Sequence, residues 1–386
     1  MKTNVIVMFA CAMLAAAQSH DKPSVLLSFM KCVDSNWPNY SNRLVEFRSF
    51  VPQLSDLTSS GAAQSALLER AAATTREHFG NTVFVRAVVE LSNFCREQCA
   101  YCGMRRSNTG LKRFRAQADQ LAELILNHRP ACVTDINLQA GEDPVAVREV
   151  ALPLIHRLRS ETNLGISVCL GTLNAELYRA MQEAGASIYI MKFECGDPAE
   201  YAELQAPGTL VERLNHIRLL AENGWAVSSG FIVGLPGQTP ATMVKSLELA
   251  ATLPLRGCSV SPFIPGESTP LAGFPPANPD WTINCMAALR LMQPGWVIPA
   301  VSALNLAEKD GYRHGLRAGA NLVTMNITPE KMRGDYIIYK RDRFIMTEER
   351  VLSAIEAEGL VPSSMGLAEY FRNNPKCAVT ENAVAS

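Results

Sequence analysis

From residue 82 onward, short apolar runs alternate with longer stretches in which apolar residues recur every three or four positions. The short runs are rich in Val, Ile and Phe, which is typical of strands buried on both faces of a sheet. The expected strands cover residues 83–91, 132–139, 166–171, 187–194, 226–234, 259–264, 296–301 and 321–326.

The longer stretches have the period of amphipathic helices. Strands that alternate with helices pair in parallel through right-handed crossovers. The pattern therefore predicts an α/β fold, a closed (β/α)8 barrel of the TIM type, with its functional site at the carboxyl ends of the strands. An open doubly wound sheet is the alternative. The expected helices cover residues 117–128, 145–161, 174–186, 210–224, 239–253 and 282–292.

The chain on either side of this repeat is expected to play a supporting role. Residues 21–80 read as an N-terminal helical extension, in which the helix over 66–80 ends at Gly80. The barrel is expected over 81–372. The polar, small residues 373–386 are expected to form a flexible tail.

The first twenty residues have a composition of their own. Lys2 precedes an uncharged apolar run and small residues, a pattern that resembles a secretory signal with a short apolar core. The alternatives are organelle targeting or a start codon assigned too far upstream. Because the clustered cysteines described below suit a reducing compartment, we expect a cytoplasmic protein, with an organelle matrix as the alternative.

Composition excludes several classes of function. The formal net charge is −1, from 36 basic and 37 acidic residues, so a nucleic-acid partner is not expected. No stretch after the first twenty residues reaches the roughly 18 apolar residues that a membrane span needs, so no membrane partner is expected. Eleven cysteines in 386 residues are too sparse for a disulfide scaffold.

Three of those cysteines lie close together, in "NFCREQCAYCGMRR", directly after the first expected strand. A structural zinc site normally has four ligands, but the next cysteine is Cys132 and the next histidine is His128. An iron–sulfur cluster held by only three thiolates leaves one iron open to a ligand. The spacing of Cys95, Cys99 and Cys102 therefore favours an open cluster. A noncatalytic metal-binding scaffold is the alternative.

Several other expected strands also end in turns that contain glycine or acidic residues. "QAGEDP" follows the second strand, where Gly141 permits close approach of the backbone and Glu142 and Asp143 carry negative charge. "KFEC" places Glu194 at the end of the fourth strand, and the glycine-rich "GFIVGLPGQT" places Ile232 at the end of the fifth. In a barrel, these turns meet at the same mouth.

The spacing C-x-x-x-C-x-Y-C after a strand resembles the signature of radical S-adenosylmethionine (SAM) enzymes. With "LKRFR", "QAGEDP", "VERLN", "FIVGLPGQT" and "PFIPGESTPLA", the chain from about 82 to 328 resembles the branch containing biotin synthase, the hydrogenase maturase HydE and the methylornithine synthase PylB, and HydE most closely.

That resemblance implies a 4Fe–4S cluster on the three clustered cysteines and reductive cleavage of SAM to a 5′-deoxyadenosyl radical. The radical would act on a small amino-acid-like or metal-bound substrate. The electron would come from a one-electron donor of the flavodoxin or ferredoxin type. An arginine of "VERLN" is expected to bind the SAM carboxylate through a bidentate fork. The SAM contacts that the resemblance implies are Tyr101, Gly141, Glu142, Asp143, Glu194, Arg213 and Ile232.

The chain departs from the cysteine patterns of its apparent relatives. Where biotin synthase has cysteines for a second cluster inside the barrel, this chain has Ser228 and Ile136, and Cys169 is displaced by two positions. Some HydE proteins carry a C-terminal cysteine triplet, of which only Cys377 is present here. A second cluster is therefore not expected.

Six residues on the last three expected strands or after them, five of them polar, form a pool of substrate contacts, since alternation turns about half of a strand's side chains inward. Their mild polarity suits a small zwitterionic or cysteine-derived substrate. PylB-like binding of an α-amino acid is weakened because residues 298–306 hold no acid. We expect HydE-like hydrogenase cofactor maturation, with PylB-like or another biotin-synthase-like chemistry as alternatives. The pool comprises Ser261, Phe263, Ser302, Asn305, Thr324 and Asn326.

Overall fold

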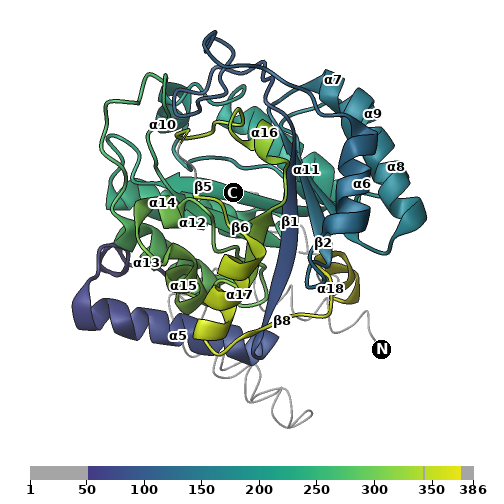
Figure 1. The fold of residues 1–386 in the computed structure, drawn as a ribbon. Coiled ribbons are helices and arrows are strands. Elements are labelled where there is room, and N and C mark those ends of the chain that lie inside the picture. The colour runs from purple at the N-terminus through teal and green to yellow at the C-terminus, as the bar shows by residue number, and fades with distance from the viewer. Residues whose placement is uncertain (1–50, 342–343, 375–386) are drawn as a thin grey trace, which may run out of the picture. The chain divides into compact units, whose positions relative to one another are not determined.

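A parallel β-sheet forms the centre of residues 51–341 and 344–374, the part of the chain that the computed structural model describes (Figure 1). Neighbouring strands follow the order β6, β5, β4, β3, β2, β1 and β7, and every pair is parallel. The strands are β1 (Thr82–Ser92), β2 (Asp135–Ala140), β3 (Gly165–Cys169), β4 (Ile188–Ile190), β5 (Ala226–Val233), β6 (Gly257–Pro262) and β7 (Leu322–Asn326).

A short extended segment joins the two edge strands, β6 and β7. Val297 forms a parallel bridge with Gly257 of β6, and Pro299 forms one with Leu322 of β7. Only isolated bridges form here because proline has no backbone N–H to contribute to a ladder. All eight expected strands are thus present, the seventh in reduced form, and the predicted (β/α)8 barrel is confirmed.

Each expected helix is present, and Figure 1 shows these helices around the outside of the sheet. The helix expected over 145–161 is interrupted by a π-turn, η1 (Val147–Ala151), next to Pro153, which lacks the N–H that a regular helix would use. The remaining helices of the barrel are α6 (Ala118–His128), α7 (Pro144–Ala146), α8 (Leu152–Glu161), α9 (Ala175–Ala184), α10 (Pro198–Glu203), α11 (Leu210–Glu222), α12 (Pro240–Thr252), α13 (Pro279–Met292), α14 (Leu304–Ala307), α15 (Gly311–Arg317), α16 (Glu330–Arg333) and α17 (Glu348–Ala357).

Two helices, α4 (Leu54–Leu57) and α5 (Gly61–Phe79), precede the barrel, and α5 packs against α13. The predicted end of the helix at Gly80 is confirmed, because Gly80 follows α5 with a φ of 62°, a conformation that favours glycine. The expected targeting segment and most of the expected tail lie outside the described residues. Among the described helices, none has the length and apolar character to cross a membrane.

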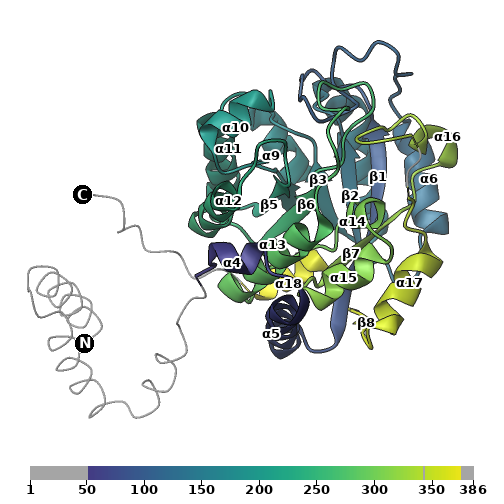
Figure 2. The same cartoon turned by 90° about the vertical axis from the view of Figure 1, so that its left-hand side faces the viewer.

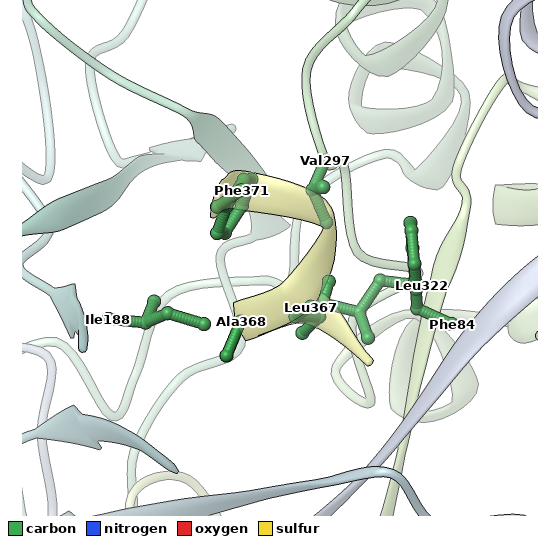
Figure 3. Close-up of a cluster of buried hydrophobic side chains, with 7 residues drawn as sticks. All are labelled: Phe84, Ile188, Val297, Leu322, Leu367, Ala368 and Phe371. Atoms are coloured by element: carbon green, nitrogen blue, oxygen red, sulfur yellow. The ribbon is translucent and has the colours of Figure 1, made fainter. Parts of the chain in front are cut away.

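The amino-terminal end of the barrel is sealed by α18 (Leu367–Asn373), a helix that the sequence pattern did not predict. β8 (Val361–Pro362) pairs with the start of β1 and leads the chain there, and Figure 2 shows α5, β8 and α18 near this end. Apolar side chains of α18 pack on the starts of the strands, which leaves the carboxyl end for ligands (Figure 3). This cluster comprises Phe84, Ile188, Val297, Leu322, Leu367, Ala368 and Phe371.

A buried carboxylate attaches this helix to the sheet. Asp135 of β2 accepts hydrogen bonds from the backbone N–H groups of Leu367 (2.8 Å) and Ala368 (3.3 Å) and from the hydroxyl of Thr134 (2.8 Å). The two N–H groups at the start of a helix have no partner within it, so a carboxylate there is stabilising.

Asp135→Asn should lower the free energy of unfolding by about 1–3 kcal/mol, because an amide that replaces the carboxylate leaves buried donors poorly paired. Urea unfolding measures this change, and faster amide exchange in α18 should accompany it. Glu369→Gln, at an exposed position of the same helix, is the matched control and should leave both unchanged. Equal stability of the two variants would contradict a fastening role for Asp135.

Candidate functional site

The three clustered cysteines lie in the loop that follows β1, at the carboxyl end of the barrel. Cys99 is buried, whereas Cys95 and Cys102 keep some accessible surface. Backbone hydrogen bonds tie the loop to distant segments, from Ala100 N–H to the carbonyl of Leu204 (2.7 Å) and from Gly103 N–H to that of Ile338 (3.0 Å). The fold thus holds the loop from two sides.

Burial raises the pKa of all three thiols, that of Cys102 to about 12, and negative charge on one thiol further raises the pKa of another. The thiols therefore stay protonated until a metal displaces their protons. Backbone donors oppose this effect, since the N–H of Glu142 donates to the sulfur of Cys95 at 3.3 Å and that of Met104 lowers the pKa of Cys102. Such donors favour the thiolate once a metal is bound.

Arg113, from the "LKRFR" stretch, closes the loop on itself. Its guanidinium donates to the carbonyls of Met104 (2.8 Å), Arg105 (2.7 Å) and Asn108 (3.2 Å), and also to the carbonyl of Asn93. One planar group with five donors can hold several carbonyls at once. Arg113 thereby fixes the path of the chain on both sides of the cysteines.

The turn after β2 is pressed against the cysteine loop at Gly141. The N–H of Gly141 donates to the carbonyl of Ser92 at 3.0 Å. A Cβ atom on Gly141 would lie 2.2 Å from the carbonyl oxygen of Phe94 and 2.8 Å from Cβ of Cys95. Only glycine allows this approach, so the turn and the cysteine loop form one unit.

Gly141→Ala should push the turn away from the cysteine loop, because neither neighbouring atom is the end of a flexible side chain. We expect the iron content after anaerobic reconstitution to fall by more than half, with the fold retained by circular dichroism. Gly237→Ala is the control. A Cβ added at Gly237 would meet no atom within 4 Å, but its φ of 82° is unfavourable for alanine, so this variant has backbone strain without a clash. Normal iron content in Gly141→Ala would show that the contact is dispensable.

The two acids beside Gly141 are anchored by arginines. Arg96 donates to Glu142 at 2.8 Å, and Arg115 donates to Asp143 at 2.7 Å. The hydroxyl of Ser92 adds a bond of 2.7 Å to Asp143. Although burial alone would raise the pKa of Asp143, the bonds from Arg115 and Ser92 lower it. These carboxylates therefore bind the turn to the cysteine loop.

Glu194 and Arg213 face this unit from the segment after β4 and from α11. Arg213 is buried and donates to the hydroxyl of Thr172 at 2.6 Å, while its Nε has no partner among the described residues. Burial alone would lower the pKa of Arg213, but Tyr201 and the carboxylates of Glu142 and Glu194 raise it. A buried, fully charged guanidinium with a spare donor is suited to an anionic ligand.

The backbone at Glu194 has an unusual conformation. Its φ is 64°, which is rare for residues other than glycine, and its carbonyl accepts from the N–H of Ile232 at 2.7 Å. Glu194 also raises the pKa values of Cys99, Tyr101 and Cys102. The structure therefore brings the expected SAM contacts from four strand ends to the same region as the three thiols.

Four of the six expected substrate contacts lie at the end of β6 or on β7. Ser261 accepts a hydrogen bond from Lys192 (3.3 Å), and Thr324 accepts one from Arg86 (2.9 Å). Asn326 donates to Glu90 at 2.9 Å, and Phe263 is buried directly after β6.

The other two expected substrate contacts have different surroundings. Ser302 is exposed in the turn before α14. The amide of Asn305 accepts from the N–H of Tyr312 (3.1 Å) and donates to the sulfur of Met346 (3.4 Å). The carbonyl of Met346 also accepts from the N–H of Asn326 at 3.0 Å, so Asn305 and Asn326 contact the same residue.

Two basic residues, Arg86 of β1 and Lys192 in the segment just after β4, were not expected from the sequence motifs. Their positive charge lowers the pKa of the Cys169 thiol. Burial has the larger effect, so the pKa is raised overall. Burial alone would lower the pKa of Lys192, but Tyr339 and Glu194 raise it, so the ammonium stays charged. The available signal was a basic residue within an apolar strand, which is costly unless it has a function or a partner.

Comparison with known proteins agrees with this geometry. Residues 89–250 match the family model described as Radical SAM superfamily. The FeFe hydrogenase maturase subunit HydE of Thermotoga maritima is 32% identical over 274 residues, 71% of this chain and 78% of that protein. The 3-methylornithine synthase of Methanosarcina acetivorans is 31% identical over 294 residues, 74% of this chain and 82% of that protein.

Solved structures show the same fold. The crystal structure of methylornithine synthase (PylB) matches with a TM-score of 0.73 and 25% identity, covering 83% of this chain and 96% of that one. The crystal structure of the FeFe hydrogenase maturase HydG matches with a TM-score of 0.68 and 18% identity, covering 83% of this chain and 72% of that one.

Proposed function

The chain belongs to the radical SAM superfamily and is an enzyme of that superfamily, and from this premise we propose that it acts in the maturation of a FeFe hydrogenase cofactor. The reaction class comes from the family. The specific step is proposed from the likeness to HydE and from the chemistry of the barrel. The observation that carries the proposal is the convergence of three thiols with Glu194 and Arg213 at the carboxyl end of the barrel.

The thiols of Cys95, Cys99 and Cys102 fit a 4Fe–4S cluster. They share one loop, affect one another's pKa values and receive backbone donors that favour thiolates. When bound, the cluster supplies the electron that cleaves SAM reductively to methionine and a 5′-deoxyadenosyl radical.

The protein's own groups would position SAM. The spare Nε of buried Arg213 supports binding of the SAM carboxylate, and Glu194 supplies negative charge at the same end of the barrel. Gly141 keeps the turn after β2 in contact with the cysteine loop, which supports a position for this turn beside the ammonium group. Tyr101 and Ile232 complete the expected contacts around the cofactor. Each residue holds or orients SAM, and the enclosing barrel limits access of water.

The interior of the barrel supports a small substrate with an anionic group. Lys192 and Arg86 hold positive charge beside hydroxyls of Ser261 and Thr324. Neither cation has an acidic ion-pair partner within the described residues, and both keep some accessible surface. A carboxylate or another anion would meet charge-assisted donors here. An amino-acid-derived substrate, free or metal-bound, agrees with this lining.

One anaerobic experiment tests the proposal. The reconstituted protein, reduced with dithionite and given SAM, should form 5′-deoxyadenosine. It should also support activation of apo-hydrogenase in a maturation mixture that lacks only HydE. Lys192→Met should still cleave SAM but should activate apo-hydrogenase at least about tenfold less, since a lost charged hydrogen bond costs about 1.5–3 kcal/mol.

Two results would contradict the proposal. Absence of 5′-deoxyadenosine would indicate a noncatalytic scaffold. Conversion of lysine to 3-methylornithine, without hydrogenase activation, would indicate the alternative that the likeness to methylornithine synthase favours.

A further inference from the structure

Six basic side chains belong to the cysteine loop and to a second segment in contact with it, and we refer to them as the basic collar. Four of its members belong to the loop that carries the cysteines, and two belong to the segment that follows α16. The segments are in contact, since Gly103 N–H donates to the carbonyl of Ile338 and Met104 packs with Tyr336 and Ile337. The basic collar comprises Arg105, Arg106, Lys112, Arg113, Lys340 and Arg341.

The charge of this loop differs from that of the chain. Residues 93–116 contain six basic residues and one acidic residue, Glu97, whereas the whole chain has a formal net charge of −1. Positive charge is therefore concentrated at the loop that holds the three thiols. The rest of the chain is correspondingly acidic.

Two arginines of the same loop, Arg96 and Arg115, are used internally in ion pairs with acids of the neighbouring turn. Within the described ranges, no member of the collar forms an ion pair, and the guanidinium groups of Arg105 and Arg113 bond to neutral oxygens of the protein itself. Arg106, Lys112, Lys340 and Arg341 are exposed. The charge of these four exposed residues is therefore available to a partner.

We infer that the basic collar is the docking surface for an acidic one-electron carrier protein that reduces the site. This inference rests on the proposed function, because reductive cleavage of SAM consumes an electron that must come from outside. Complementary charge steers two proteins together and orients them, raising the association rate by about 10 to 1000-fold at low salt. The collar would place such a carrier beside the loop whose thiols Cys95 and Cys102 keep accessible surface.

The electron count is simple. A flavin hydroquinone in the carrier gives up one electron and becomes the semiquinone. SAM takes up that electron by way of the enzyme, and its bond between sulfur and C5′ breaks. Methionine leaves, and the 5′-deoxyadenosyl fragment carries the unpaired electron. The carrier adds no atom to the products, so its contribution depends only on how it docks and on its reduction potential.

The test uses the reconstituted full chain with two reductants, purified flavodoxin hydroquinone and dithionite. Arg106→Glu with Lys112→Glu should lower 5′-deoxyadenosine formation driven by flavodoxin at least about tenfold at low salt, because charge reversal removes steering. The rate with dithionite should stay within about twofold, since small reductants need no docking surface. Arg76→Glu with Arg372→Glu, exposed positions on α5 and α18, is the control of equal charge change and should match the wild type.

Added salt should also lower the flavodoxin rate of the wild type more than that of the double variant, because ions screen the collar. An unchanged flavodoxin rate in the double variant, or an equal loss with dithionite, would overturn the inference. So would binding of a 20-nucleotide RNA through these residues with no reduction by flavodoxin. If the wild type forms no 5′-deoxyadenosine even with dithionite, the proposed function itself fails.

Discussion

Cys99→Ala should abolish the formation of 5′-deoxyadenosine, reducing it to the background of a mixture without protein. Cys99 is the middle residue of the three and the one with the least accessible surface, and both neighbouring thiols affect its pKa. With two thiolates left, a cluster has lost one of the three ligands proposed for it. The visible charge-transfer absorption and the bound iron and sulfide should fall together with the activity.

Cys132→Ala is the matched control for that experiment. Cys132 is a free cysteine that keeps some accessible surface and lies just before β2, outside the cysteine loop. This control should retain iron, sulfide and SAM cleavage at the level of the wild type. If the Cys99 variant kept its iron and its SAM cleavage, the ligand set proposed for the cluster would be wrong.

Arg213→Ala should weaken SAM binding about 10 to 100-fold, because a buried charge-assisted hydrogen bond contributes about 1.5–3 kcal/mol. The guanidinium is buried, and its Nε has no partner within the described part of the chain. Arg213→Lys should recover only part of the affinity, since an ammonium keeps the charge but not the planar pair of donors. Titration calorimetry of the reconstituted protein with SAM measures the dissociation constant.

The iron content of both Arg213 variants should stay normal, which separates loss of SAM binding from loss of the cluster. Arg218→Ala replaces an exposed arginine on the same helix, α11, and should leave SAM affinity unchanged. An Arg213→Ala protein with the affinity of the wild type would remove the basis for assigning this residue to the SAM carboxylate.

The barrel itself was predictable because its strands are buried on both faces and therefore stand out as apolar runs. The parts that the pattern missed have physical reasons. Pro299 limits the seventh strand to isolated bridges, and a π-turn before Pro153 interrupts the regular hydrogen bonding of one helix. α18 is short and becomes stable through its contacts with the strand starts and with Asp135, none of which a local pattern records.

The candidate site was predictable to the extent that its residues are close in sequence. The cysteine spacing and the Gly141 turn were visible as motifs. The partners of Glu142 and Asp143 were not, because Arg96 and Arg115 meet them only in the folded chain. Lys192 was hidden for a related reason, since its position inside the barrel follows from the register of the strands rather than from a motif.

The central claim is that the three-cysteine loop holds a cluster whose open iron binds SAM. Electron paramagnetic resonance of the reduced, reconstituted protein with SAM labelled with nitrogen-15 at its amino group tests this claim most directly. We expect the signal of a reduced 4Fe–4S cluster with hyperfine coupling to the label, and loss of both in Cys99→Ala. A protein that shows no such signal and holds one zinc ion at the loop would contradict the claim.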